Sequence, residues 1–154
     1  MALNTSAPSY TSGQVVTAAQ LNALQDGIQA AWTAYTPTAS GGLTVGNGTW
    51  GAAYMRIGKT IHVRVLFTLG STSAVASAIS VSLPVAQLVN GSVVLAGHVL
   101  DSSAGATGRL PASAVGNGAG TVGVYTSGGS LTSTVPFTWA TGDVIAFSGT
   151  YEAA

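Results

Sequence analysis

Two histidines and four carboxylates are the side chains of this sequence that serve most often as metal ligands or as acids and bases. His62 and His98 both fall on predicted strands, and neither has a second ligand two or four residues farther along the chain. One interpretation is a metal on a symmetry axis, with one imidazole from each subunit. The other is a plain surface or interface histidine, which the isolated positions favour. We therefore predict no metal site.

A hydrolase would need either an activated nucleophile or a pair of carboxylates. The sequence has no G-x-S-x-G elbow. Asp101 and Asp143 are the candidates for a glycosidase pair, by elimination among the four acids. Asp143 follows Gly142 directly before a predicted strand, which is a common turn position for aspartate. We predict no catalytic residues and a non-enzymatic protein, and a polysaccharide depolymerase is kept as a minor alternative.

The glycines at 46, 48 and 51 match the dinucleotide-binding pattern G-x-G-x-x-G. That pattern binds a pyrophosphate only between a strand and the start of a helix. Here the residues that follow alternate as a strand, and no acidic residue lies about 20 positions on. Asn47-Gly48 is typical of a hairpin turn instead. We predict no cofactor.

Charge is scarce throughout the chain. Only 5% of its 154 residues are charged, with four basic and four acidic residues, and the segment 65–100 has no formal charge. A neutral, poorly charged surface favours association, so we expect the chain to assemble with copies of itself. The balance of charges predicts neither nucleic-acid nor membrane binding. Segment 65–100 is also interrupted by Gly70, Pro84 and Gly91, unlike a membrane helix.

One amphipathic helix is predicted near the N-terminus, after an extended arm. Thr17 and Gln20 fit a capping box, and the helix is expected to end near Trp32. Its apolar positions recur at three- and four-residue spacing and form a seam for oligomer contact: Leu21, Leu24, Ile28, Ala31 and Tyr35. A seam that packs on the chain's own β domain is the alternative.

After the helix, the apolar residues alternate with period two. The clearest strand is 60–69, with Ile61, Val63 and Val65 among the residues on one face. Further strands are predicted at 51–57, 78–83, 92–100, 121–126, 131–137 and 143–151, and a long loop at 102–120. The fold class is therefore mainly β, an antiparallel β-sandwich or jelly roll preceded by the arm and the helix. Two regions are expected: residues 1–35 for attachment and oligomerisation, and residues 36–154 as the β-sandwich domain.

Several motifs resemble one family of phage proteins. The segment 13–22, GQVVTAAQLN, resembles the start of many tail-fibre and minor tail proteins of phages that infect actinobacteria. The β module that follows it in those proteins is similar to YTP at 35–37, GNGT at 46–49, YMRIGKTIHVR at 54–64, SLP at 82–84 and PFTWATGD at 136–143. This resemblance implies a homotrimer displayed on the particle surface.

Together these features predict a structural protein of the virion, made in the bacterial host cytoplasm. The minor tail or fibre type, with adhesion to a host-surface glycan, is the first hypothesis, and the receptor-binding residues are unknown. A capsid decoration or head-fibre protein is the alternative, because only about four helical turns precede the β domain. Its expected partners are copies of itself and other tail or capsid proteins.

Overall fold

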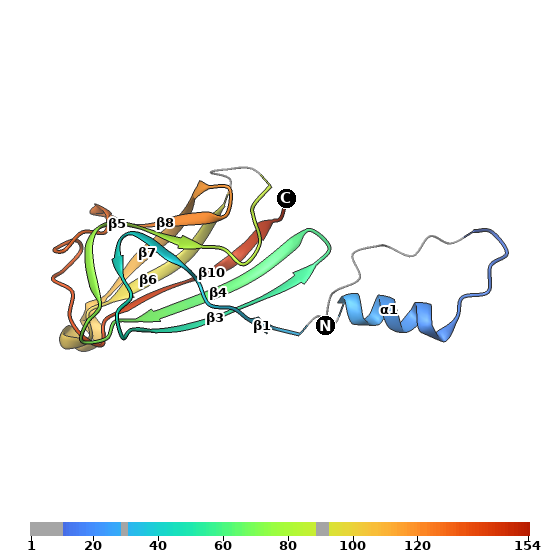
Figure 1. Cartoon of the computed structure of the whole chain (residues 1–154), viewed down its shortest axis with the longest axis horizontal. Coiled ribbons are helices and arrows are strands. Elements are labelled where there is room, and N and C mark those ends of the chain that lie inside the picture. The colour runs from blue at the N-terminus through green and yellow to red at the C-terminus, as the bar shows by residue number, and fades with distance from the viewer. Residues whose placement is uncertain (1–10, 29–30, 89–92) are drawn as a thin grey trace.

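The computed structural model describes residues 11–28, 31–88 and 93–154, and these are mainly β (Figure 1). The helices are α1 (Ala18–Ile28) and the short 3-10 helix η1 (Ser102–Gly108). The strands are β1 (Thr33–Ala34), β2 (Ala39–Thr44), β3 (Thr49–Ile57), β4 (Thr60–Thr68), β5 (Ala74–Ser82), β6 (Val94–Leu100), β7 (Arg109–Gly118), β8 (Thr121–Thr126), β9 (Gly129–Ser130) and β10 (Val144–Glu152).

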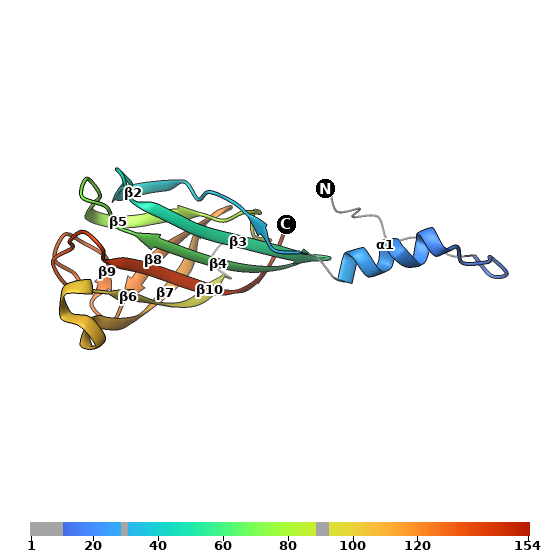
Figure 2. The same ribbon diagram turned by 90° about the horizontal axis from the view of Figure 1, so that it is seen from below.

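The strands form one antiparallel sheet that curls around a single core (Figures 1 and 2). Their order across the sheet is β1-β3-β4-β10-β6-β7-β8-β5-β2, with β9 paired to β8. The predicted mainly β class is therefore confirmed. The arrangement is a curled sheet, so the finer assignment to a sandwich or jelly roll stays a prediction.

The predicted alternation of β4 is confirmed residue by residue. Ile61, Val63 and Phe67 are buried, whereas Arg64 and Leu66 on the other face are exposed. The pleat places successive side chains on opposite faces, so a strand with this pattern contributes every second residue to the core. The inward faces of the remaining long strands complete the same apolar cluster.

The capping box predicted for α1 is present. The Thr17 backbone N–H donates to Gln20 Oε1 at 2.9 Å, and the Gln20 N–H donates to Thr17 Oγ1 at 3.3 Å. The prediction that the helix extends to Trp32 is wrong, because the described helix ends at Ile28 and the chain turns into β1 at Thr33. Pairing of β1 with β3 replaces helical hydrogen bonds there.

Tyr35 belongs to the β structure and not to the helix. Its ring meets Tyr54 of β3 edge to face, with centroids 5.9 Å apart at 84°. Its backbone N–H donates to Ala52 O at 3.1 Å. Burial of the Tyr35 ring against the core stabilises the chain more than another turn of exposed helix would. Ala31 and Tyr35 of the predicted seam therefore both lie beyond α1.

Two other local predictions are wrong. The expected loop 102–120 contains η1 and the long strand β7, which pairs with β6 on one side and β8 on the other. The expected strand 131–137 is a loop with one isolated bridge between Thr132 and Val135. Pro136 has no N–H to offer a ladder, and the Trp139 indole N–H donates to Thr132 O at 2.9 Å, which holds the loop against the core.

Helix α1 extends away from one end of the β domain (Figures 1 and 2). Leu21 is 56% exposed and Leu24 is 40% exposed, so none of the residues that the structure describes covers these two positions of the seam. The predicted alternative was a seam packed on the chain's own β domain, and Leu21 and Leu24 do not pack on that domain. Residues 1–10 of the predicted arm lie outside the described residues.

We predict that Val65→Asp destabilises the fold by about 4 kcal/mol, because it places an unpaired charge at a position that is 3% exposed. The matched control is Leu66→Asp, the same change at the next residue, which faces out and should cost less than about 1 kcal/mol. Urea unfolding followed by circular dichroism measures both. Equal losses would contradict the register of β4.

Candidate functional site

The two histidines do not meet. His62 on β4 lies opposite Thr150 of β10, and His98 on β6 lies opposite Ala146 of the same strand. One strand and four residue positions therefore separate them, which is about 10 Å across the sheet and about 13 Å along it. The His62 Nδ1 instead lies 3.0 Å from the Thr150 hydroxyl. No cluster of three metal-ligating side chains occurs in the segments that the structure describes.

Gly46 and Gly48 of the glycine-rich segment lie in the turn between β2 and β3, and Gly51 lies in β3. Asn47 links this turn to the loop after β4, since its side-chain oxygen accepts from the Thr72 N–H at 2.9 Å and its amide nitrogen donates to Ser71 Oγ at 3.0 Å. The Asn47 backbone N–H also donates to Thr72 Oγ1 at 2.9 Å. The Asn47 N–H is thereby occupied, and the Gly48 N–H donates to Val45 O at 2.9 Å, so two backbone donors that could meet a phosphate are already bonded and the turn has a structural role.

Asp101 and Asp143 do approach the same end of the domain, around Ser102. Asp143 is 0% exposed. Its Oδ1 accepts from the Ser102 N–H at 2.9 Å and the Ser102 hydroxyl at 3.0 Å, and its Oδ2 accepts from the Ala140 N–H at 2.7 Å. A buried carboxylate with three donors ties the loop before β10 to the start of η1. Such a group cannot reach a substrate.

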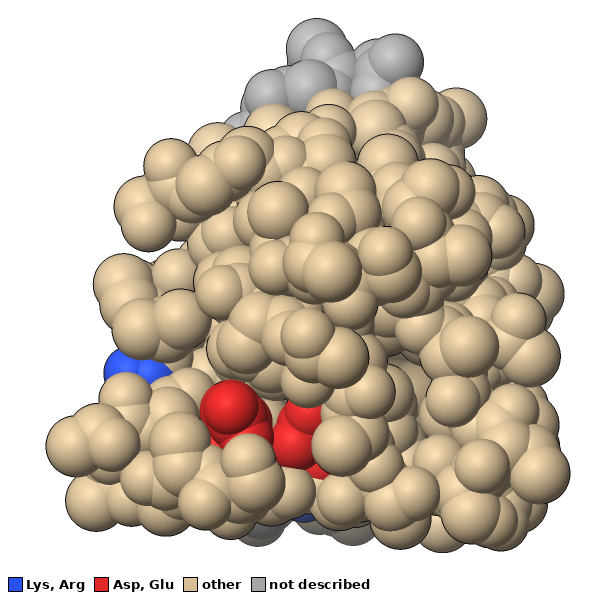
Figure 3. Space-filling model, turned by 90° about the vertical axis from the view of Figure 1, so that its left-hand side faces the viewer, with Lys and Arg blue, Asp and Glu red and all other residues tan. Residues whose placement is uncertain are grey.

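Asp101 caps η1 from the exposed side. Its Oδ1 accepts from the Ser103 hydroxyl at 2.6 Å and from the Ser103 and Ala104 N–H groups at 2.9 and 3.3 Å. The hydrogen bond from the Ser103 hydroxyl is the main cause that lowers the pKa of Asp101. Figure 3 shows this end of the molecule, where small patches of acidic residues and a patch of basic residues at one edge interrupt a largely uncharged surface. The arrangement matches a helix cap.

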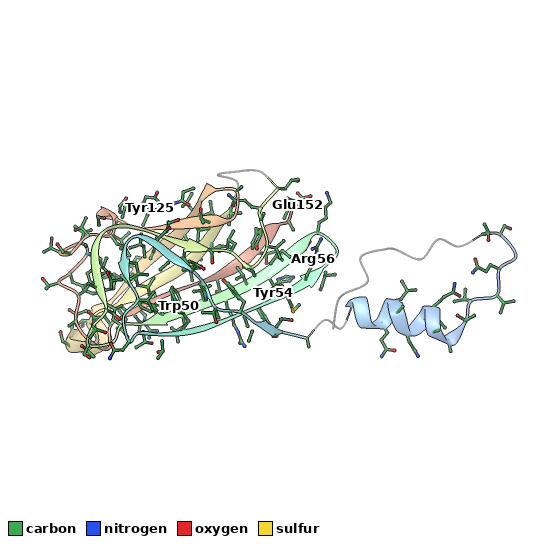
Figure 4. The ribbon with its side chains drawn as sticks, in the orientation of Figure 1. Trp50, Tyr54, Arg56, Tyr125 and Glu152 are labelled. Carbon is green, nitrogen blue, oxygen red and sulfur yellow. The ribbon has the colours of Figure 1, made fainter. Side chains whose placement is uncertain are left out.

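The aromatic residues do not form a common stacking surface. Trp50 and Tyr54 lie along β3, whereas Tyr125 lies on β8, across the curled sheet (Figure 4). Trp50 packs inward on Phe67, with ring centroids 4.4 Å apart. Tyr151 is buried, its hydroxyl donates to Val85 O at 2.7 Å, and burial raises the pKa of Tyr151 to about 12. These rings stabilise the core.

A trough of about 580 Å³ crosses the outer face of β3, β4, β10 and β6. Small residues line it because small side chains recur at the outward positions of these strands: Gly51, Ala53, Ala96, Ala146 and Ser148. Arg64, Leu66 and His98 are the large side chains that line it. The cross-strand register places Leu66 and His98 on either side of Ala146, so the trough runs over β10 between them.

Arg64 is held at this trough by an aromatic contact. Its guanidinium carbon lies 4.8 Å from the centroid of the Trp32 ring. This cation–π contact orients the planar group, and within the described residues the guanidinium has no hydrogen bond or ion pair. On the other side, desolvation lowers the pKa of His98, and the nearby charge of Arg109 lowers it further.

This trough was not among the features predicted from the sequence. The signal was present as small residues at alternate positions of neighbouring strands, but strand order was needed to align them. Of the predicted seam, the structure places Leu21 and Leu24 together on exposed turns of α1 and Ile28 at its last residue. The oligomer contact itself stays a prediction.

No protein-family model matches this chain, and no curated protein and no solved structure matches it either. The resemblance to phage tail proteins therefore stays a prediction. None of the helices in the described segments has the length and apolar character that a membrane crossing requires.

We predict that Asp143→Asn lowers the free energy of unfolding by about 3 kcal/mol, because the amide turns a hydrogen-bond donor toward the N–H of either Ser102 or Ala140. Glu152→Gln, at an exposed position, is the control and should change it by less than about 0.5 kcal/mol. Urea titration gives both values. Equal stability of Asp143→Asn and the parent chain would contradict the structural role.

Proposed function

We propose that this chain is a non-enzymatic structural protein of a bacteriophage virion, of the minor tail or fibre type. In this role the N-terminal region up to the end of α1 attaches the chain and trimerises, and the β domain, which includes β1 and Tyr35, faces outward and adheres to the host surface. The observation that carries the proposal is the uncovered apolar seam of α1, with Leu21 and Leu24 exposed beyond the end of the β domain. A seam of this kind is stable in water only with a partner.

Three further features support the proposal. The sequence resembles actinobacteriophage tail proteins in both its helical segment and its β module. Charge is scarce, at 5% of residues, which suits a protein packed among other subunits. The buried, fully bonded Asp143 supports a structural role for the carboxylates, and so no depolymerase activity is proposed.

We also propose that the two halves of the curled sheet pack face to face as a sandwich or jelly roll. Phe67 of β4 and Val81 of β5 are separated by four strands in the sheet order, yet both belong to one core. A well-packed domain of this kind is a rigid carrier for surface loops. A capsid decoration or head-fibre protein is the second candidate, because α1 has only 11 residues and a fibre shaft is longer.

We predict that the full chain is a trimer and that Leu21→Asp/Leu24→Asp is a monomer, because two charges on the seam oppose its burial. The matched control, Ala19→Asp/Asn22→Asp, adds the same charge to other exposed positions of α1 and should stay trimeric. Light scattering on size-exclusion fractions at micromolar concentration measures the masses. A monomeric parent chain would contradict the oligomer contact.

We predict that antibodies against the β domain label intact particles of the phage that encodes the chain. Gold-labelled antibody in the electron microscope shows the position directly. Label at the tail supports the minor tail or fibre role, and label over the head supports the decoration role. Particles without label, alongside labelled disrupted particles, would contradict display on the virion surface.

A further inference from the structure

We propose that the trough over β10 binds an acidic glycan, with Arg64 and His98 contacting its anionic groups. The inference rests on the adhesive role proposed above and deepens it, because it names the ligand class and the surface. The surface differs from the loops at the end of the domain: it is the outer face of the sheet formed by β3, β4, β10 and β6.

The charge on this face is mainly positive. The outward positions of β4, β6 and β7 carry His62, Arg64, His98 and Arg109, as the cross-strand register shows. The carboxylate that shares this face is Glu152, which lies on β10 six residues beyond Ala146 and away from the trough. Arg64 and Arg109 carry the fixed positive charge of this face, and cations without a neutralising partner raise the local concentration of anions.

Arg64 is oriented toward a ligand before binding, by its contact with Trp32. Its contact with Trp32, at 4.8 Å from the ring centroid, limits the positions that the guanidinium can take. A pre-oriented guanidinium loses less entropy when it binds a carboxylate or phosphate through two parallel hydrogen bonds. The exposed Trp32 ring also offers an apolar face beside the charge, a combination that suits a sugar with its C–H groups and acidic substituent.

The lining and the size of the trough suit a small, flat ligand. Its floor is made of small side chains, so a flat ligand can approach the backbone of β10 closely. Its volume of about 580 Å³ falls within the range of about 300–1,000 Å³ that is typical of small-molecule sites. The Ser148 hydroxyl and the exposed Leu66 add one polar and one apolar contact.

The like charges also argue against a second copy of this face as the occupant. Two such faces packed together would bring Arg64 and His98 near the same groups of the partner. Juxtaposed like charges are costly at an interface, whereas an anionic partner relieves the repulsion between His98 and Arg109. The sign of the charge therefore favours an acidic glycan.

Binding should strengthen as the pH falls. The pKa of His98 is lowered in the free protein by desolvation and by Arg109, and an anion in the trough favours the protonated imidazole. The ligand therefore raises the pKa of His98 and takes up a proton when it binds. The charged groups that face His98 are Arg109 of β7 and, across β10, Arg64 of β4.

The test uses the full chain and three polymers: polygalacturonate, which carries carboxylates, poly(glycerol phosphate), which carries phosphodiesters, and neutral dextran. Titration calorimetry at about pH 7.5 and about pH 5.5 spans the titration of histidine. We expect at least one acidic polymer to bind, more tightly at the lower pH, and dextran not to bind. Carboxylate or phosphodiester preference identifies the source of the anion.

Arg64→Gln should weaken this binding at least about tenfold, and His98→Gln should abolish its pH dependence. Lys59→Gln, in the exposed turn between β3 and β4, removes one positive charge away from the trough and should bind like the parent chain. Circular dichroism confirms that each variant is folded.

Equal binding by Arg64→Gln and Lys59→Gln would overturn the inference. Equal affinity for dextran, or for single-stranded DNA, would also overturn it. A change of oligomeric mass in Arg64→Gln would instead assign the face to a subunit contact and overturn it as well. If antibodies label the particles but calorimetry finds no glycan binding, only this inference is rejected. If calorimetry finds glycan binding but antibodies do not label the particles, only the virion role is rejected.

Discussion

Nine residues of β10 pair with nine residues of β4, and this ladder joins the C-terminal strand to the first long hairpin of the domain. β10 also pairs with β6, so it lies at the centre of the strands that form the outer trough. Because the pairing is antiparallel and in register, it sends Phe67 and Ile145 into the core and Leu66 and Ala146 outward. A shift by one residue would exchange the two faces, and the core would be lost.

Scarcity of charge shapes the rest of the molecule. No ion pair occurs within the described residues, so side-chain hydrogen bonds fix the loops at the ends of the strands. Asn47 joins two turns and Asp143 joins the start of η1 to the loop before β10. Short polar side chains that bond to backbone groups are well suited to this task, because they lose little conformational entropy on folding.

The proposed role divides the molecule into two surfaces. Leu21 and Leu24 of the α1 seam are apolar and exposed among the described residues, which suits contact with other subunits. The outer sheet face combines small residues with Arg64 and His98, which suits a soluble anionic ligand. The two surfaces belong to different elements, so one surface can be changed by mutation without disturbing the other.

Features that depend on neighbouring residues could be predicted from the amino-acid sequence. The capping box at Thr17, the alternation of β4 and the strand 121–126 follow from side chains a few positions apart, and the structure has all three. The alternation of apolar and polar residues with period two also predicts a mainly β fold without knowledge of strand order.

Features that depend on distant partners needed the folded chain. β7 is rich in Gly, Ala and Ser, which have weak β propensity, and it is a strand because β6 and β8 supply its ladders. Tyr35 lies in the β structure and not in the helical seam, because its ring is stabilised by packing against Tyr54, which is distant in sequence. The trough depends on the order of strands that are up to about 95 residues apart in sequence, and no local pattern specifies that order.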